Sequence, residues 1–150
     1  KGEEYERNSE IHSIGTTANI HDWQDRKDGL LGITALGVDR FEIDKTRTQP
    51  DGLTVAKVKI LDEESKKIIP QQYLYMQQLL EHISQQEAKV FKPEDGFAEI
   101  LYQLIFLLPL NSNLKQRLLE IPKSLDRANI LHAELIRLGI IQQHKPDIGT

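Results

Sequence analysis

The side chains best suited to chemistry in this chain are five histidines, and their spacing does not assemble a metal site. They are His12, His21, His82, His132 and His144. No two of them form the His-x-x-x-His pair that places two imidazoles on one helix face, an arrangement typical of zinc sites. His12 and His21 fall out of phase with the apolar side of a strand pattern, so we expect them on the surface. The histidines therefore predict no bound metal.

Three aspartates recur every third residue in one short segment, at Asp22, Asp25 and Asp28. A calcium loop of the EF-hand type needs oxygen ligands at alternate positions and a distal Glu, and this segment has neither. Arg26 and Lys27 also neutralise the carboxylates. We interpret the segment as a solvated hairpin loop.

Two further patterns could suggest an enzyme. Lys123 and Ser124 are adjacent, and neighbours in sequence cannot place an amine against a hydroxyl as a base and nucleophile require. Gly29, Gly32 and Gly37 do not form Gly-x-Gly-x-x-Gly, and no Gly-Lys-Ser/Thr is present. We therefore expect no cofactor, no nucleotide and no enzymatic activity. An enzyme whose site assembles from distant residues remains an alternative.

Composition and charge narrow the class of protein. The chain has 150 residues, a hydrophobic fraction of 39%, no Cys and a net charge of −4. Residues 1–68 carry 11 Lys/Arg against 14 Asp/Glu, and residues 69–150 carry 8 against 9. Neither half has the basic surface that nucleic-acid binding demands, so we expect no nucleic-acid partner. The absence of Cys fits a cytoplasmic protein.

The elements that would position any site divide into two kinds. Residues 11–43 alternate with a period of two, which predicts half-buried antiparallel strands. The apolar side carries Ile14, Thr16, Ala18, Ile20, Leu31, Ile33 and Ala35, and the alternation resumes at Phe41 and Ile43. Asp28-Gly29 supplies a tight turn, and Gly37 marks a turn or a bulge. A last strand is expected from Leu53 to Ile60, with Lys57 and Lys59 pointing outward.

From Pro70 onward the apolar period becomes helical. We expect about four helices. The segment from Phe97 to Leu108 is apolar nearly all round, and it is too short for the roughly 20 residues that span a bilayer. It should be a buried central helix, and we expect no membrane segment. The sequence thus predicts an α+β protein with a β-lobe at residues 1–68 and a helical lobe at residues 69–150.

Two groups of short motifs resemble the amino-terminal domain of Lon proteases, which also occurs as a free-standing protein and within cereblon. The first group is Gly15-Thr16-x-Ala18-x-Ile20, Asp28-Gly29-Leu30-Leu31-x-Ile33 and Gly37-x-x-Arg40-Phe41. The second is Leu108-Pro109-Leu110, Leu114-Lys115-Gln116-x-Leu118-Leu119-Glu120 and Leu125-x-Arg127. Their order and separation make the resemblance specific, and together they span residues 1–139.

The resemblance implies a fold and a function. The fold is a small antiparallel barrel similar to the PUA type, followed by a bundle of about four helices. The function is binding of unfolded or tagged polypeptide by a stand-alone, non-enzymatic module, with a protease or ATPase as a further partner. The family's Pro-Leu-Phe-Pro-Leu opening is not present, nor are Lon's ATPase and Ser-Lys protease domains. The alternative function is a structural or oligomerising domain.

Only a few residues are candidates for such binding, and each of them can also be explained by a role in the structure of the protein. Trp23 could contact a protein partner or fold over the end of the barrel. Tyr73 and Met76 could form an apolar contact surface or belong to the core. Arg40 could bind a ligand carboxylate, although we favour a structural ion pair at the Gly37 turn. Without the family's opening strands, we expect residues 11–20 or 53–61 to pair with a strand outside this chain, or with another copy in a homo-oligomer.

Overall fold

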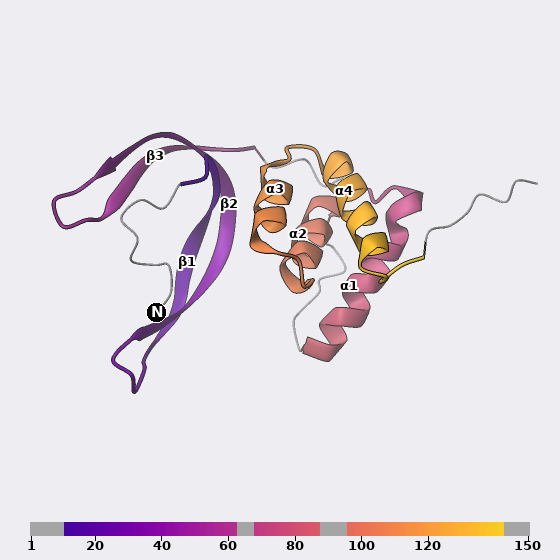
Figure 1. Cartoon of the computed structure of the whole chain (residues 1–150), viewed down its shortest axis with the longest axis horizontal. Helices are drawn as coiled ribbons and strands as arrows, with labels where there is room; N and C mark the ends of the chain where they lie inside the picture. The colour runs from indigo at the N-terminus through magenta and orange to yellow at the C-terminus, as the bar shows by residue number, and fades with distance from the viewer. Residues whose placement is uncertain (1–10, 63–67, 88–95, 143–150) are drawn as a thin grey trace, which may run out of the picture. The chain divides into compact units, whose positions relative to one another are not determined.

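The computed structural model describes residues 11–62, 68–87 and 96–142. The chain divides into two compact units, Lys1–Glu63 and Glu64–Thr150. The first contains strands β1 (Ile14–Asp25), β2 (Leu31–Thr48) and β3 (Thr54–Ile60). The second contains the 3-10 turn η2 (Gln71–Tyr73) and helices α1 (Leu74–Glu87), α2 (Phe97–Leu107), α3 (Ser112–Glu120) and α4 (Ser124–Arg137) (Figure 1). The α+β class predicted from the sequence is confirmed.

The β unit is an open antiparallel sheet in the order β1-β2-β3. β2 is the long central strand. Its first part pairs with β1 alone, Phe41 and Glu42 pair with both neighbours, and the part from Ile43 to Thr48 pairs with β3 alone. A barrel would require the two outer strands to pair with each other or with further strands. Within the described residues β1 and β3 do not pair, so this part of the chain forms an open sheet, as expected for a barrel without the family's opening strands.

A bulge beside Gly37 reverses the side-chain phase of β2. Ala18 pairs with Gly37 and Thr16 pairs with Arg40, so β2 carries one more residue than β1 in this interval. The Thr17 hydroxyl fixes the bulge, because its Oγ1 accepts a hydrogen bond from Asp39 N at 2.9 Å and donates one to Asp39 O at 3.2 Å. The bulge predicted at Gly37 is therefore present.

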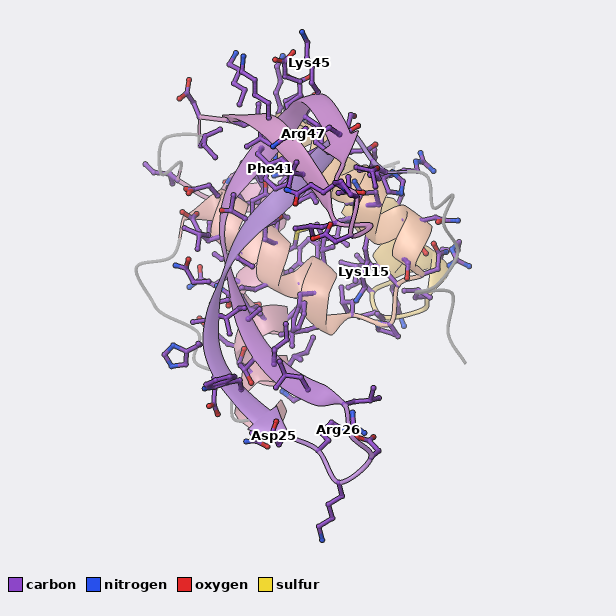
Figure 2. All side chains as sticks on the ribbon, turned by 90° about the vertical axis from the view of Figure 1, so that its left-hand side faces the viewer. Asp25, Arg26, Phe41, Lys45, Arg47 and Lys115 are labelled. Atoms are coloured by element: carbon purple, nitrogen blue, oxygen red, sulfur yellow. The ribbon has the colours of Figure 1, made fainter. Side chains whose placement is uncertain are left out.

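The reversal of phase corrects one detail of the sequence interpretation. Phe41 and Ile43 do not continue the apolar side of Ile33, as an unbroken alternation would require, but lie on the opposite face of the sheet. There the ring of Phe41 covers Gly15, its cross-strand partner (Figure 2). A Cβ atom added at Gly15 would lie 2.5 Å from Phe41 Cζ, so only glycine leaves room for the ring.

The helical unit holds the hydrophobic core of the described chain. Its buried apolar side chains are Tyr73, Met76, Leu80, Phe97, Ile100, Leu101, Leu104, Ile105, Leu108, Leu110, Leu118, Ala128, Leu131 and Leu135. Helix α2 contributes more of them than any other helix of this set, which confirms the prediction of a central buried helix. Leu108 ends α2 in an extended conformation directly before Pro109, which cannot continue a helix.

Side chains hold both ends of α3. At the N-terminus, Asn111 Oδ1 accepts a hydrogen bond from Leu114 N at 2.9 Å. At the C-terminus, the buried guanidinium of Arg127 donates from Nε to Leu118 O at 2.8 Å and from a terminal nitrogen to Ile121 O. Its positive charge faces the negative end of the helix dipole. The ring of Tyr102 lies 4.3 Å from the guanidinium carbon, so Arg127 joins α2, α3 and α4.

We predict that Leu104→Ala lowers the free energy of unfolding by about 2–5 kcal/mol, because it empties a fully buried position in α2. Phe106→Ala on the same helix is the matched control, since Phe106 is largely exposed. Denaturant unfolding measures both variants. A loss below about 1 kcal/mol for Leu104→Ala would contradict its place in the core.

Candidate functional site

The free half of the β1–β2 hairpin, residues 18–37, is the most unusual surface of the described chain. We call it the arm. It extends beyond β3 as a two-stranded ribbon (Figure 1). On one of its faces Trp23 pairs with Ile33, Ile20 pairs with Ala35, and Leu31 lies opposite Asp25. Cross-strand partners share a face, so these apolar side chains form one continuous strip.

A second bulge creates the strip. Ile20 pairs with Ala35 and Asp22 pairs with Thr34, so His21 is an extra residue in β1. Without it, strict alternation would place Trp23 on the opposite face from Ile20. The backbone N of Trp23 donates to Asp22 Oδ1 at 2.8 Å, and this contact holds the chain directly after the extra residue.

The tip of the arm is an ordered turn in which Asp28 has hydrogen-bond and ion-pair partners within the turn. Gly29 has a φ of +78°, and its N donates to Arg26 O at 3.0 Å. Asp28 accepts from Leu30 N at 3.1 Å and forms an ion pair with Arg26 at 3.0 Å. The hairpin loop predicted from Asp28-Gly29 is confirmed. Figure 2 shows Asp25 and Arg26 at this end of the ribbon.

The apolar strip is open to solvent within the described structure. Trp23 is 72% exposed and Ile20 is 67% exposed, and Leu31 and Ile33 are each more than half exposed. The other face of the arm is more polar, with Asn19, Asp22, Gln24 and Thr34. A two-stranded ribbon is marginally stable alone, and a contiguous exposed apolar surface marks a contact site. The arrangement therefore offers binding through apolar contact.

Of the three side chains suggested as protein contacts, the structure leaves only Trp23 on the surface. Tyr73 is 4% exposed and Met76 is 0% exposed, and both belong to the core of the helical unit. Tyr73 stacks on Phe97 with ring centroids 5.7 Å apart. Of the two interpretations given for Tyr73 and Met76, the structure therefore shows the place in the core, because a buried side chain cannot contact a partner unless the unit unfolds. The sequence could not distinguish a contact surface from a core position, since both produce a stripe of apolar residues along a helix.

Arg40 lies half-buried on β2 and pairs with Thr16 on β1. Within the described residues its Nε atom is buried without a hydrogen-bond partner. Beside it, the backbone N and O of Asp39 are both bonded to the Thr17 hydroxyl, and these bonds hold the bulge.

The helical unit contains a small polar cluster where α1 meets α4. Tyr73 donates to Asn129 Oδ1, and the Tyr75 hydroxyl lies 2.6 Å from His132 Nδ1. Burial raises the pKa of Tyr75 to about 12, and the neighbouring Tyr73 adds to the shift. The Tyr75 hydroxyl is thus neutral at physiological pH. Its contact with His132 joins the two helices and supplies no activated nucleophile.

No group of three or more His, Cys, Asp or Glu side chains among the described residues could hold a metal ion. No described helix is long and apolar enough to cross a membrane. A surface hollow of about 320 Å³ lies beside α3, and its lining consists of Arg117, Leu118, Glu120, Ile121, Pro122 and Ile130. The lining combines apolar side chains with the charged Arg117 and Glu120.

The described chain thus combines a β unit that carries an exposed apolar strip with a bundle of helices that follows it. Residues 1–137 match the family described as the ATP-dependent protease La (LON) substrate-binding domain. The match covers most of the chain, and the protein belongs to this family.

Solved structures support the fold. The Lon N-terminal domain protein from Xanthomonas campestris is similar with a TM-score of 0.68 at 24% identity, over 81% of this chain and 68% of that chain. The N-terminal domain of the Mycobacterium avium complex Lon protease is similar with a TM-score of 0.62 at 17% identity, over 91% of this chain and 74% of that chain. No curated protein matched the sequence.

We predict that Tyr75→Phe lowers the free energy of unfolding by about 0.5–1.5 kcal/mol, because it removes the hydrogen bond to His132. The pH dependence should change as well. The folded pKa of about 12 lies above the unfolded value of about 10, so the contribution of Tyr75 is fully present below pH 10 and is lost as the pH rises to 12. Denaturant titrations between pH 8 and pH 12 should show a smaller alkaline decline in the variant. Equal declines would contradict the burial of this hydroxyl.

Proposed function

We propose that this protein is a non-enzymatic module that binds unfolded or tagged polypeptide through the apolar strip of the arm. The observation that carries the proposal is the exposure of Ile20, Trp23, Leu31 and Ile33 on one face of a two-stranded ribbon. The family to which the chain belongs is described by its role in substrate binding, which supports the same function.

The physical basis of binding is burial of apolar surface. Unfolded chains expose the apolar side chains that folded proteins hide, and the strip offers them a surface of similar chemistry. Complete burial of one large aliphatic or aromatic side chain contributes about 1.5–3 kcal/mol. A strip of four such residues supports weak binding, and the more polar reverse face limits contact to one side of the ribbon.

We further propose that the bound chain is passed to a protease or an ATPase, and that the protein acts in the cytoplasm. The lack of Cys is consistent with a reducing compartment. In this role the protein recognises and holds a chain, while the partner unfolds or cleaves it. A structural or oligomerising role is the competing function, and the strip would then be covered permanently.

The test uses the single Trp of the chain as its own reporter. Because Trp23 is exposed, its fluorescence should shift to shorter wavelength when an unfolded polypeptide without Trp, reduced and carboxymethylated ribonuclease A, covers the strip. We expect saturable binding at a concentration below about 1 mM, equivalent to at least 4.1 kcal/mol. No saturable binding up to that concentration would favour the structural role.

Two substitutions on β2 localise the binding. Ile33 and Leu36 have nearly equal exposure, 55% and 54%, but lie on opposite faces of the arm. Ile33→Ser should weaken binding about tenfold or more, since it removes one of the apolar contacts. Leu36→Ser is the matched control and should leave the affinity nearly unchanged. Equal effects of the two variants would contradict binding by the strip.

A further inference from the structure

The end of the apolar strip nearest the turn carries one charged side chain, that of Asp25. Asp25 pairs with Leu31 and follows Trp23 by two residues, and the pairing between these positions is regular. Residues two apart on a strand lie on one face, about 6.5–7 Å from each other along the strand. Asp25 therefore shares the face of Trp23 and Ile33, and its carboxylate borders the strip at the end of the ribbon (Figure 2).

The nearest cation does not neutralise this carboxylate. The guanidinium of Arg26 forms its ion pair with Asp28, at 3.0 Å. The stem of Arg26 covers Gly32 on the reverse face of the arm, where a Cβ atom added at Gly32 would lie 3.5 Å from Arg26 Cδ. Asp25 is exposed and forms no ion pair with any described residue. Its negative charge is therefore available to a chain bound on the strip.

The indole ring of Trp23 is a second group on this face that attracts a cation. Trp is the aromatic side chain that binds cations best, and Trp23 is 72% exposed. A cation held between Trp23 and Asp25 would contact the ring and the carboxylate together. A guanidinium suits both, because it is planar, stacks on aromatic rings and donates two parallel hydrogen bonds to a carboxylate.

We propose that the strip selects polypeptide segments in which an arginine directly follows or precedes a run of apolar residues. The apolar side chains of the segment cover Ile33 and the neighbouring strip, while the arginine lies against Trp23 with its guanidinium at Asp25. This inference rests on the proposed polypeptide-binding function and names the class of segment that is bound. Trp23, Asp25 and Ile33 lie outside residues 11–20 and 53–61, where we expect pairing with further strands.

The charge of the arm favours such a segment over other occupants. The arm contains three Asp against one Arg and one Lys, and the whole chain has a net charge of −4, so basic segments are attracted and acidic ones are repelled. A purely apolar segment would take water from Asp25 without giving it a partner, which is unfavourable. A second copy of the strip is a poor occupant as well, because its face carries Asp25 and no Arg or Lys.

The first experiment measures the preference by fluorescence anisotropy with the full chain. The probe is a labelled peptide with three Val followed by one Arg between Gly-Ser ends, and matched peptides have Lys, Gln or Glu in place of the Arg. We expect the Arg peptide to bind about fivefold or more tightly than the Gln peptide, and the Glu peptide to bind most weakly. Raising the ionic strength from about 0.05 M to about 0.5 M should reduce this preference, because salt screens exposed charges. Equal affinity for the Arg and Gln peptides would overturn the proposal.

Two substitutions on β1 test the carboxylate. Asp25→Asn should remove most of the preference for Arg over Gln and leave the affinity for the Gln peptide nearly unchanged. Asp22→Asn is the matched control, because it removes the same charge from the reverse face and keeps the Oδ1 atom that accepts from Trp23 N. An equal loss of preference in both variants would indicate attraction by net charge alone and would overturn the proposal, as would an unchanged preference in Asp25→Asn.

A substitution of the aromatic ring tests the stacking. Trp23→Leu keeps an apolar side chain on the strip but removes the ring, so the Arg and Lys peptides should bind this variant with more similar affinities. An unchanged ratio of the two affinities would overturn the role of Trp23. Far-UV circular dichroism confirms that each variant is folded.

The proposed function is tested separately by the unfolded ribonuclease A and the Ile33→Ser variant. If unfolded ribonuclease A binds but the Arg peptide binds no better than the Gln peptide, the selection of arginine fails and the proposed function stands. If neither ribonuclease A nor any of the peptides binds up to about 1 mM, both proposals are overturned.

Discussion

The phase of side-chain alternation along β1 and β2 is the constraint on which the candidate surface depends. A strand shows alternate residues on opposite faces, and one extra residue exchanges the faces of everything that follows. The extra residue at His21 brings Trp23 to the side of Ile20. The extra residue near Gly37 moves Phe41 to the other side, where its ring fills the space above Gly15. The irregularity at Asp44 then keeps Lys45 on the same face as Glu42.

The two units differ in how they place their apolar side chains. The buried apolar side chains of the described residues all come from the helical unit, where Arg127 holds the end of α3 and Tyr75 joins α1 to α4. The sheet instead presents most of its large apolar residues to solvent, with Ile14, Phe41 and Ile43 half-buried. Exposed side chains of this kind can rearrange without disturbing a packed core, which suits the binding function that we propose.

The sequence was informative wherever a single local rule applied. Asp28-Gly29 predicted the turn, Phe97–Leu108 predicted the buried helix, and the short motifs led to the correct family. Strict alternation counted from Ile14 assigned residues beyond Gly37 to the wrong face of the sheet. The reason is that the bulge depends on a contact between residues distant in sequence, here Thr17 with Asp39. The same limit applies to Tyr73 and Met76. A period of 3.6 shows which side of a helix is apolar but not whether another helix covers that side.

The concentration of buried apolar surface in one unit has a consequence for how this molecule would melt. The heat capacity change of unfolding arises mainly from apolar surface that becomes hydrated. The helical unit has most of that surface to expose, while Trp23, Ile20 and Ile33 are largely hydrated before unfolding begins. A calorimeter would therefore record chiefly the helices. Separation of the strands would add little to the heat capacity change, so a single sharp transition would report on the helices and not on the exposed apolar strip.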